Sequence, residues 1–124
     1  MRHIETMINI LLIEDDDVLR GYLADGLIQA GHHVIEAQSG NEGLRLFKQN
    51  APEMIITDLV MDDGEGIESI LSVRKLAPSI PLIAISGNAL YLESSKKLGA
   101  DKVMEKPFTM TELLTCIRQF VAQT

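Results

Sequence analysis

Acidic residues follow two short apolar runs in this sequence: a group of four after the first and a single aspartate after the second. Glu14-Asp15-Asp16-Asp17 follows the run that ends at Ile13, and Asp58 follows Met54–Thr57. Three carboxylates within about 5 Å of one another repel by roughly 3 kcal/mol per pair at an effective dielectric constant of about 20, so such a cluster binds a cation or holds protons. Carboxylate oxygens without histidine or cysteine favour Mg²⁺. The sequence therefore predicts a magnesium site wherever the two groups meet.

A hydroxyl and an amine follow two later apolar runs. Ser86 comes after Leu82–Ile85, and Lys106 comes shortly after Lys102–Met104. A lysine ammonium and a hydroxyl donor both suit a phosphoryl group, and an aspartate beside them can act as a nucleophile and form an acyl phosphate. Taken singly, each residue has an ordinary interpretation as a helix cap, a solvated loop or a surface lysine. Their joint placement favours phosphoryl chemistry.

Five apolar runs alternate with five amphipathic patterns along the chain. The runs predict a buried strand at Ile8–Ile13, a weaker strand at His33–Ala37, strands at Met54–Thr57 and Leu82–Ile85, and a brief last strand at Lys102–Met104. The amphipathic patterns predict helices between Leu19 and Ala30, Ser39 and Pro52, Gly66 and Ala77, Leu90 and Leu98, and Thr109 and Val121. Capping-box spacing at Ser39–Glu42 and Thr109–Glu112 supports two of the helix starts.

Strands that are apolar on both faces and separated by helices indicate an α/β fold with a parallel sheet covered on each side. Right-handed crossovers make such a sheet doubly wound, and its ligands bind beyond the carboxyl ends of the strands. All the candidate groups follow strands. We therefore expect them to lie together at one edge of the sheet.

The sequence resembles the receiver domains of two-component response regulators, the family that includes the chemotaxis regulators. The resemblance runs from Ile8 to Val121 and rests on motifs in a fixed order: Leu11-Leu12-Ile13-Glu14-Asp15-Asp16, Asp58-Leu59-Val60-Met61, Gly66-Ile67-Glu68, Ser86, Gly99-Ala100-Asp101 and Lys106-Pro107-Phe108. It implies a single receiver domain over residues 1–124, with its core at 8–121. The implied fold is the flavodoxin-like (βα)5 arrangement, a five-stranded parallel sheet in the order 2-1-3-4-5.

The resemblance also implies a role for each matching residue. Asp58 is the expected phospho-acceptor, and Lys106 is expected to pair with the phosphoryl group. Ser86 is expected to reach that group when the domain switches. The expected Mg²⁺ ligands are all oxygen donors: Glu14, Asp15, Asp58 and the backbone carbonyl of Val60.

Two further expectations and one departure from the family pattern concern neighbours of these residues. Asp16 and Asp17 are expected to be solvated or to cap a helix rather than to bind metal. The Lys106–Pro107 peptide bond is expected to be cis, as is usual in the family. The loop after Asp58 departs from the family pattern, because Met61 is followed by Asp62-Asp63-Gly64 where a proline is common.

The departure that bears most on switching is Val103, three residues before the lysine, where the family usually has an aromatic residue. A valine cannot carry the usual coupled movement of hydroxyl and aromatic ring. Tyr91 is a candidate substitute, although ordinary packing is the simpler interpretation. Gly87, which follows Ser86, tolerates backbone angles that other residues avoid. We therefore expect the response to phosphorylation to concentrate in Ser86–Leu98.

Composition excludes several other classes of protein. The chain has 124 residues, is 46% hydrophobic and carries a formal charge of −7, which favours one domain without a basic surface for nucleic acid. Its apolar runs are too short to span a bilayer, and its start lacks the apolar core of a secretion signal, so we expect a cytoplasmic protein. Cys116 is the only cysteine and His32-His33 has no third ligand at metal spacing; both are expected to be structural.

Three functional hypotheses remain at this stage. The first is a phosphorylation-dependent switch that is not an enzyme, receives its phosphoryl group from a histidine kinase or phosphotransfer protein, and acts on a target or output domain. The second is a small Mg²⁺-dependent phosphohydrolase with an aspartyl nucleophile, suggested by Asp15-Asp16-Asp17. The third is a constitutive binding module, against which Asp58, Ser86 and Lys106 all argue. Dimerisation, the cognate kinase and the regulated process are left open.

Overall fold

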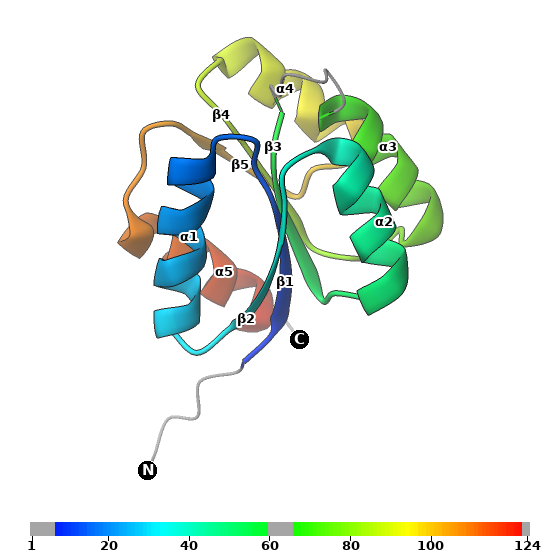
Figure 1. Cartoon of the computed structure of the whole chain (residues 1–124). Helices are drawn as coiled ribbons and strands as arrows, with labels where there is room; N and C mark the ends of the chain where they lie inside the picture. The colour runs from blue at the N-terminus through cyan, green and yellow to red at the C-terminus, as the bar shows by residue number, and fades with distance from the viewer. Residues whose placement is uncertain (1–6, 60–65, 123–124) are drawn as a thin grey trace.

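The computed structural model describes residues 7–59 and 66–122. Strands and helices alternate in chain order: β1 (Asn9–Ile13), α1 (Asp17–Gln29), β2 (His33–Ala37), α2 (Gly40–Asn50), β3 (Met54–Asp58), α3 (Gly66–Leu76), β4 (Leu82–Ser86), α4 (Ala89–Leu98), β5 (Lys102–Glu105) and α5 (Met110–Ala122). All ten predicted elements are present (Figure 1). Their ends differ from the predicted ends by one or a few residues.

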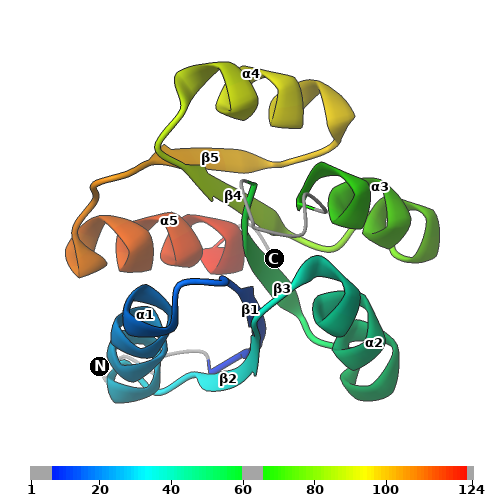
Figure 2. The ribbon, with the colours of Figure 1, turned by 45° about the horizontal axis from the view of Figure 1, so that its top comes forward.

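The five strands form one parallel sheet in the order β2-β1-β3-β4-β5. Helices α1 and α5 cover one face of this sheet, and α2, α3 and α4 cover the other (Figure 2). The doubly wound fold and the strand order that the resemblance implied are thus confirmed. The central strands β1, β3 and β4 are buried almost throughout, as expected for strands with helices on both sides.

Alternate residues of β1 face opposite sides of the sheet. Ile10 and Leu12 pack in the core beneath α1 and α5, whereas Leu11 and Ile13 pack beneath α2, α3 and α4. All four are at most 1% exposed, and burying such a side chain stabilises a protein by about 1.5–3 kcal/mol. The strand is therefore held on both faces immediately before Glu14.

Three strands, β3, β4 and β5, are one residue longer at their carboxyl ends than the runs predict, and two of these extensions concern site residues. Asp58 is the last residue of β3 and pairs in register with Ile85, and Ser86 is the last residue of β4 and pairs with Glu105. Strand pairing uses backbone groups, so a polar side chain does not end a strand by itself. This extension fixes the backbone of both candidate residues at the same edge of the sheet.

Short polar side chains begin several helices. Asp16 caps α1 by accepting hydrogen bonds from the N–H groups of Val18 and Leu19 at 2.9 and 3.1 Å. Thr109 and Glu112 form the predicted capping box at α5, each accepting the backbone N–H of the other at 3.1 and 3.0 Å. The capping role expected for Asp16 is confirmed.

Candidate functional site

Three acidic side chains meet beyond the carboxyl ends of β1 and β3. Glu14 follows β1 directly and is 0% exposed, and Asp58 is 3% exposed. Carboxylate oxygens of Glu14, Asp15 and Asp58 all lie within 4.8 Å of one another. The predicted meeting of the two acidic groups is therefore present, and we call these three residues the acidic cluster.

Lys106 reaches the acidic cluster from the loop after β5. Its Nζ lies 2.7 Å from Asp58 Oδ2 and 3.2 Å from Glu14 Oε1. The backbone N–H of Lys106 donates to the Ser86 carbonyl at 2.9 Å, which ties the start of this loop to the end of β4. The following peptide bond, Lys106–Pro107, is cis as expected.

Burial and crowding change the protonation of this site. The pKa of the Glu14 carboxyl is raised from 4.5 to about 7, mainly by burial. The charge of Asp58 and a hydrogen bond with it raise this pKa as well, whereas the Asp16 N–H, donating to Glu14 Oε2 at 3.1 Å, and the Lys106 ammonium lower it. Glu14 is therefore divided between its protonated and ionised forms near pH 7.

The Lys106 ammonium responds in the opposite way. Burial lowers its pKa, but the hydrogen bond and charge of Asp58, with a smaller effect of Glu14, outweigh burial and raise the pKa above its ordinary value. Lys106 is thus a fixed positive charge at any physiological pH. The acidic cluster therefore has three carboxyl groups and the Lys106 ammonium beside it, which leaves negative charge to attract a further cation.

The donor set of the acidic cluster fits Mg²⁺. All its side-chain donors are carboxylate oxygens, the ligands that magnesium prefers, and they lie close enough together to share one ion. Asp16 and Asp17 lie outside the cluster: Asp16 caps α1, and Asp17 pairs with Arg20 at 2.6 Å. The remaining predicted ligand, the carbonyl of Val60, lies outside the described residues.

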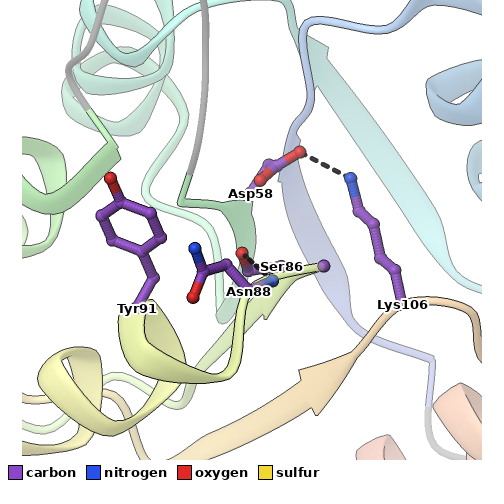
Figure 3. Close-up of a pocket in the computed structure, with 6 residues that line it drawn as sticks. Asp58, Ser86, Asn88, Tyr91 and Lys106 are labelled. Atoms are coloured by element: carbon purple, nitrogen blue, oxygen red, sulfur yellow. Dashed lines mark hydrogen bonds and ion pairs between the residues drawn. The ribbon is translucent and has the colours of Figure 1, made fainter.

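A cavity of about 260 Å³ opens beside the acidic cluster (Figure 3). The residues that line it come from the ends of β3 and β4, the β4–α4 loop, the first turn of α4 and the loop after β5: Asp58, Ser86, Gly87, Asn88, Tyr91 and Lys106. The structure thus brings all three residues predicted to handle the phosphoryl group to one cavity. It also adds Asn88 and Tyr91, which sequence reasoning did not place there.

Ser86 is connected to the start of α4. Its Oγ accepts a hydrogen bond from the backbone N–H of Asn88 at 3.0 Å, and Asn88 in turn caps α4 by accepting the N–H of Leu90 at 2.9 Å. The bond from Asn88 uses Ser86 Oγ as an acceptor, so the hydroxyl keeps its proton for donation. A movement of the Ser86 side chain would therefore change the hydrogen bonds at the start of α4.

The two residues considered as switch elements lie in different surroundings. Val103 is half-buried and packs with the core beneath α2, α3 and α4. Tyr91 lines the cavity and is 43% exposed, so it lies outside the buried core. The helical spacing of Tyr91 gave no sign of this, because the cavity depends on how the β4–α4 loop folds.

The other expectations for individual residues hold. His32 accepts the N–H of Ile8 through Nδ1 at 3.3 Å, and His33 begins β2, so both are structural. Cys116 lies in the core beneath α1 and α5. Across residues 7–59 and 66–122, no helix combines the length and apolar character that crossing a bilayer requires.

Comparison with known proteins identifies the family. The family model described as "Response regulator receiver domain" matches residues 10–118. The chain belongs to this family. Receiver domains are signalling domains of two-component systems that accept a phosphoryl group on an aspartate with the help of Mg²⁺. Membership therefore favours the switch over the phosphohydrolase.

Similar proteins agree in sequence and in fold. The KDP operon transcriptional regulatory protein KdpE of Escherichia coli (strain K12) is 35% identical over 90% of this chain and 50% of its own length. The response regulator MprA of Mycobacterium sp. (strain KMS) is 30% identical over 94% of this chain and 52% of its own length. This receiver domain thus spans about half the length of these curated relatives.

One solved structure covers nearly the same length. The CheY-like response regulator receiver domain protein from Methanospirillum hungatei JF-1 has a TM-score of 0.89 and 25% sequence identity. The similarity covers 95% of this chain and 96% of that chain. A fold match of this extent means that no large insertion separates the two structures.

Proposed function

We propose that Asp58 is the phospho-acceptor of this receiver domain and that the acidic cluster holds the Mg²⁺ its phosphorylation requires. The observation that carries the proposal is the position of Asp58. Its carboxylate is buried, lies 2.7 Å from the Lys106 ammonium, shares a cluster with two other acids, and lines a cavity together with Ser86. A phospho-acceptor needs a cavity through which the phosphoryl donor can reach it, a cation site and a nearby positive charge.

The proposed reaction moves one phosphoryl group to Asp58. An oxygen of the Asp58 carboxylate attacks the phosphorus of a phosphohistidine on a kinase or phosphotransfer protein. The new O–P bond makes an acyl phosphate, while the N–P bond breaks and its electron pair stays on the imidazole, which takes a proton from solvent. Mg²⁺, when bound, supplies positive charge that offsets the charge on the phosphoryl oxygens.

The other site residues act on the phosphoryl group after transfer. The Lys106 ammonium donates a charge-assisted hydrogen bond to the phosphoryl group, which replaces part of the interaction between Lys106 and Asp58. Ser86 donates its hydroxyl proton to a phosphoryl oxygen, and this movement alters the bond between Ser86 Oγ and the Asn88 N–H. The response then passes into the β4–α4 loop and α4, with little change at Val103.

The wider role follows from the family. The proposed donor is a sensor histidine kinase or a histidine phosphotransfer protein in the cytoplasm, and the proposed recipient of the signal is a target protein or an output domain. We infer that residues 1–124 form one receiver domain with its core at 8–121. From the formal charge of −7 we infer that the receiver domain does not bind nucleic acid itself and that any contact with DNA is made by an output domain.

Phosphorylation with a small acyl phosphate tests the proposal. The wild-type chain with Mg²⁺ is expected to gain one phosphoryl group by intact-protein mass spectrometry, and Asp58→Asn to gain none, since an amide is not nucleophilic. Asp25→Asn, which alters an exposed aspartate of α1 away from the site, is the matched control and should behave as wild type. An adduct on Asp58→Asn equal to that of wild type would assign the acceptor to another residue.

A further inference from the structure

Arg20, a residue of α1, contacts three different parts of the chain near the acidic cluster. Its Nη1 donates to the backbone carbonyl of Glu14 at 2.8 Å. Its Nη2 lies 2.6 Å from Asp17 Oδ1, and its Nε lies 3.4 Å from Glu36 Oε1 on β2. The Arg20 side chain as a whole is 17% exposed.

These contacts fix the backbone of Glu14 at both ends. The Glu14 N–H donates to the carbonyl of Ala37 at 3.0 Å, and the Glu14 carbonyl accepts from Arg20. Glu36, the neighbour of Ala37, pairs with the same guanidinium. The carbonyl of the peptide group between Glu14 and Asp15 is thus bonded to Arg20 of α1, which in turn pairs with Glu36 of β2. The carboxylates on either side of this peptide group belong to the acidic cluster.

Arg20 keeps its charge in this position. Burial lowers its pKa, but the hydrogen bond and charge of Asp17, followed by those of Glu36, outweigh burial and raise it above its ordinary value. Hydrogen bonds from a charged donor are shorter and stronger than neutral ones, and the planar fork of arginine can serve a carbonyl and a carboxylate at once. A lysine would offer charge without that geometry.

We propose that Arg20 is a positioning residue for the metal site: by holding the Glu14–Asp15 peptide, it keeps the two carboxylates at the spacing that Mg²⁺ binding requires. The proposal rests on the proposed role of the acidic cluster. Arg20 contacts Glu14 at its backbone carbonyl, not at its carboxylate. Its effect passes through the backbone, as outer-shell residues act on metal ligands elsewhere.

The test is a Mg²⁺ titration of the whole chain by isothermal calorimetry, at a temperature well below the unfolding midpoint. Arg20→Gln is expected to weaken Mg²⁺ binding by about 10-fold or more, within the range for outer-shell changes. Arg20→Lys is expected to recover part of that loss. Arg45→Gln is the matched control, since Arg45 pairs with Glu42 at 3.7 Å on the surface of α2, and should bind Mg²⁺ as wild type does.

The outcomes separate a positioning role from a purely structural one. A lower unfolding midpoint for Arg20→Gln with an unchanged Mg²⁺ dissociation constant would overturn the proposal. Should Arg20→Gln fail to fold, Glu36→Gln decides, because it releases one anchor of the guanidinium while leaving the charge in place. It is expected to weaken Mg²⁺ binding by less than Arg20→Gln, and unchanged binding would again overturn the proposal. If wild type binds no Mg²⁺, the proposed metal site itself fails.

Discussion

The two loops that flank the site are built in opposite ways. The β1–α1 loop begins with a wholly buried Glu14 whose backbone is anchored on both sides, and its next turn is capped by Asp16. The β4–α4 loop follows the buried Ser86 and consists of the exposed Gly87 and Asn88, and Leu90 in the first turn of α4 is 79% exposed.

The difference assigns the two requirements of a switch to different loops. Phosphoryl chemistry needs ligands held in place, which is what the β1–α1 loop supplies. A conformational response needs a segment that can rearrange at low cost, and such segments come from the less stable parts of a protein. We therefore expect changes in the first loop to abolish chemistry, and changes in the second to alter the response.

The largest effect is expected from Asp15→Asn in the β1–α1 loop. Losing one carboxylate of the cluster should weaken Mg²⁺ binding by roughly 100-fold or more, since changes to outer-shell residues already cost up to about 100-fold. Phosphate uptake, which depends on Mg²⁺, should fall as well. Asp16→Asn is the matched control, since asparagine still caps a helix and Asp16 is outside the cluster. Equal calorimetric Mg²⁺ affinities for Asp15→Asn and Asp16→Asn would remove Asp15 from the site.

The second prediction concerns pH in the absence of Mg²⁺. The pKa of Glu14 is about 7 in the folded protein against an ordinary 4.5, so folding favours the protonated form. This contribution is complete below pH 4.5 and is lost as pH rises through 7, by roughly 3 kcal/mol in total. Urea unfolding from pH 5 to 8 should show the decline, and Glu14→Gln should reduce it. An identical pH profile for Glu14→Gln would contradict the assignment.

Lys106 contacts residues next to both loops, because its Nζ pairs with Glu14 and its N–H donates to the Ser86 carbonyl. Removing its ammonium is expected to lower the free energy of unfolding by somewhat less. Lys106→Met leaves Asp58 without the ammonium 2.7 Å away, so at pH 8 the free energy of unfolding should fall by about 1.5–3 kcal/mol. At pH 5, where Glu14 is protonated, the loss should be smaller. Lys102→Met, on the exposed start of β5, is the control and should change stability little. A pH-independent loss in Lys106→Met would mean that packing, not charge, explains it.

The smallest effect is expected in the β4–α4 loop. A Cβ at Gly87 would meet no described atom within 4 Å, and its φ is not left-handed, so the observed conformation does not need glycine. Gly87→Ala should therefore raise the free energy of unfolding by about 0.4–1 kcal/mol, by restricting the unfolded chain. It should also reduce the amide shifts that beryllofluoride causes in Ser86–Leu98. Full-sized shifts in Gly87→Ala would show that glycine's freedom plays no part in the response.

The sequence allowed the fold and most of the site to be predicted because both depend on local patterns. Apolar runs mark the strands, and the polar residue after each run marks the edge where Asp58, Ser86 and Lys106 meet. Arg20 was missed because its partners include a backbone carbonyl and a residue of β2, which only the folded chain brings together. The position of Tyr91 and the raised pKa of Glu14 likewise depend on burial and distance, which no spacing in the sequence expresses.

The hydrogen bond between Ser86 Oγ and the Asn88 N–H also bears on how much the domain would signal without a phosphoryl group. On the proposed mechanism this bond holds α4 in its resting position, so that the unphosphorylated domain would signal only in the fraction of molecules where the bond is broken. A net hydrogen bond of about 1 kcal/mol lowers that fraction roughly fivefold. If Ser86 moves as proposed, one backbone N–H would limit background signalling, and the same bond would add to the free energy that phosphorylation must supply to move Ser86.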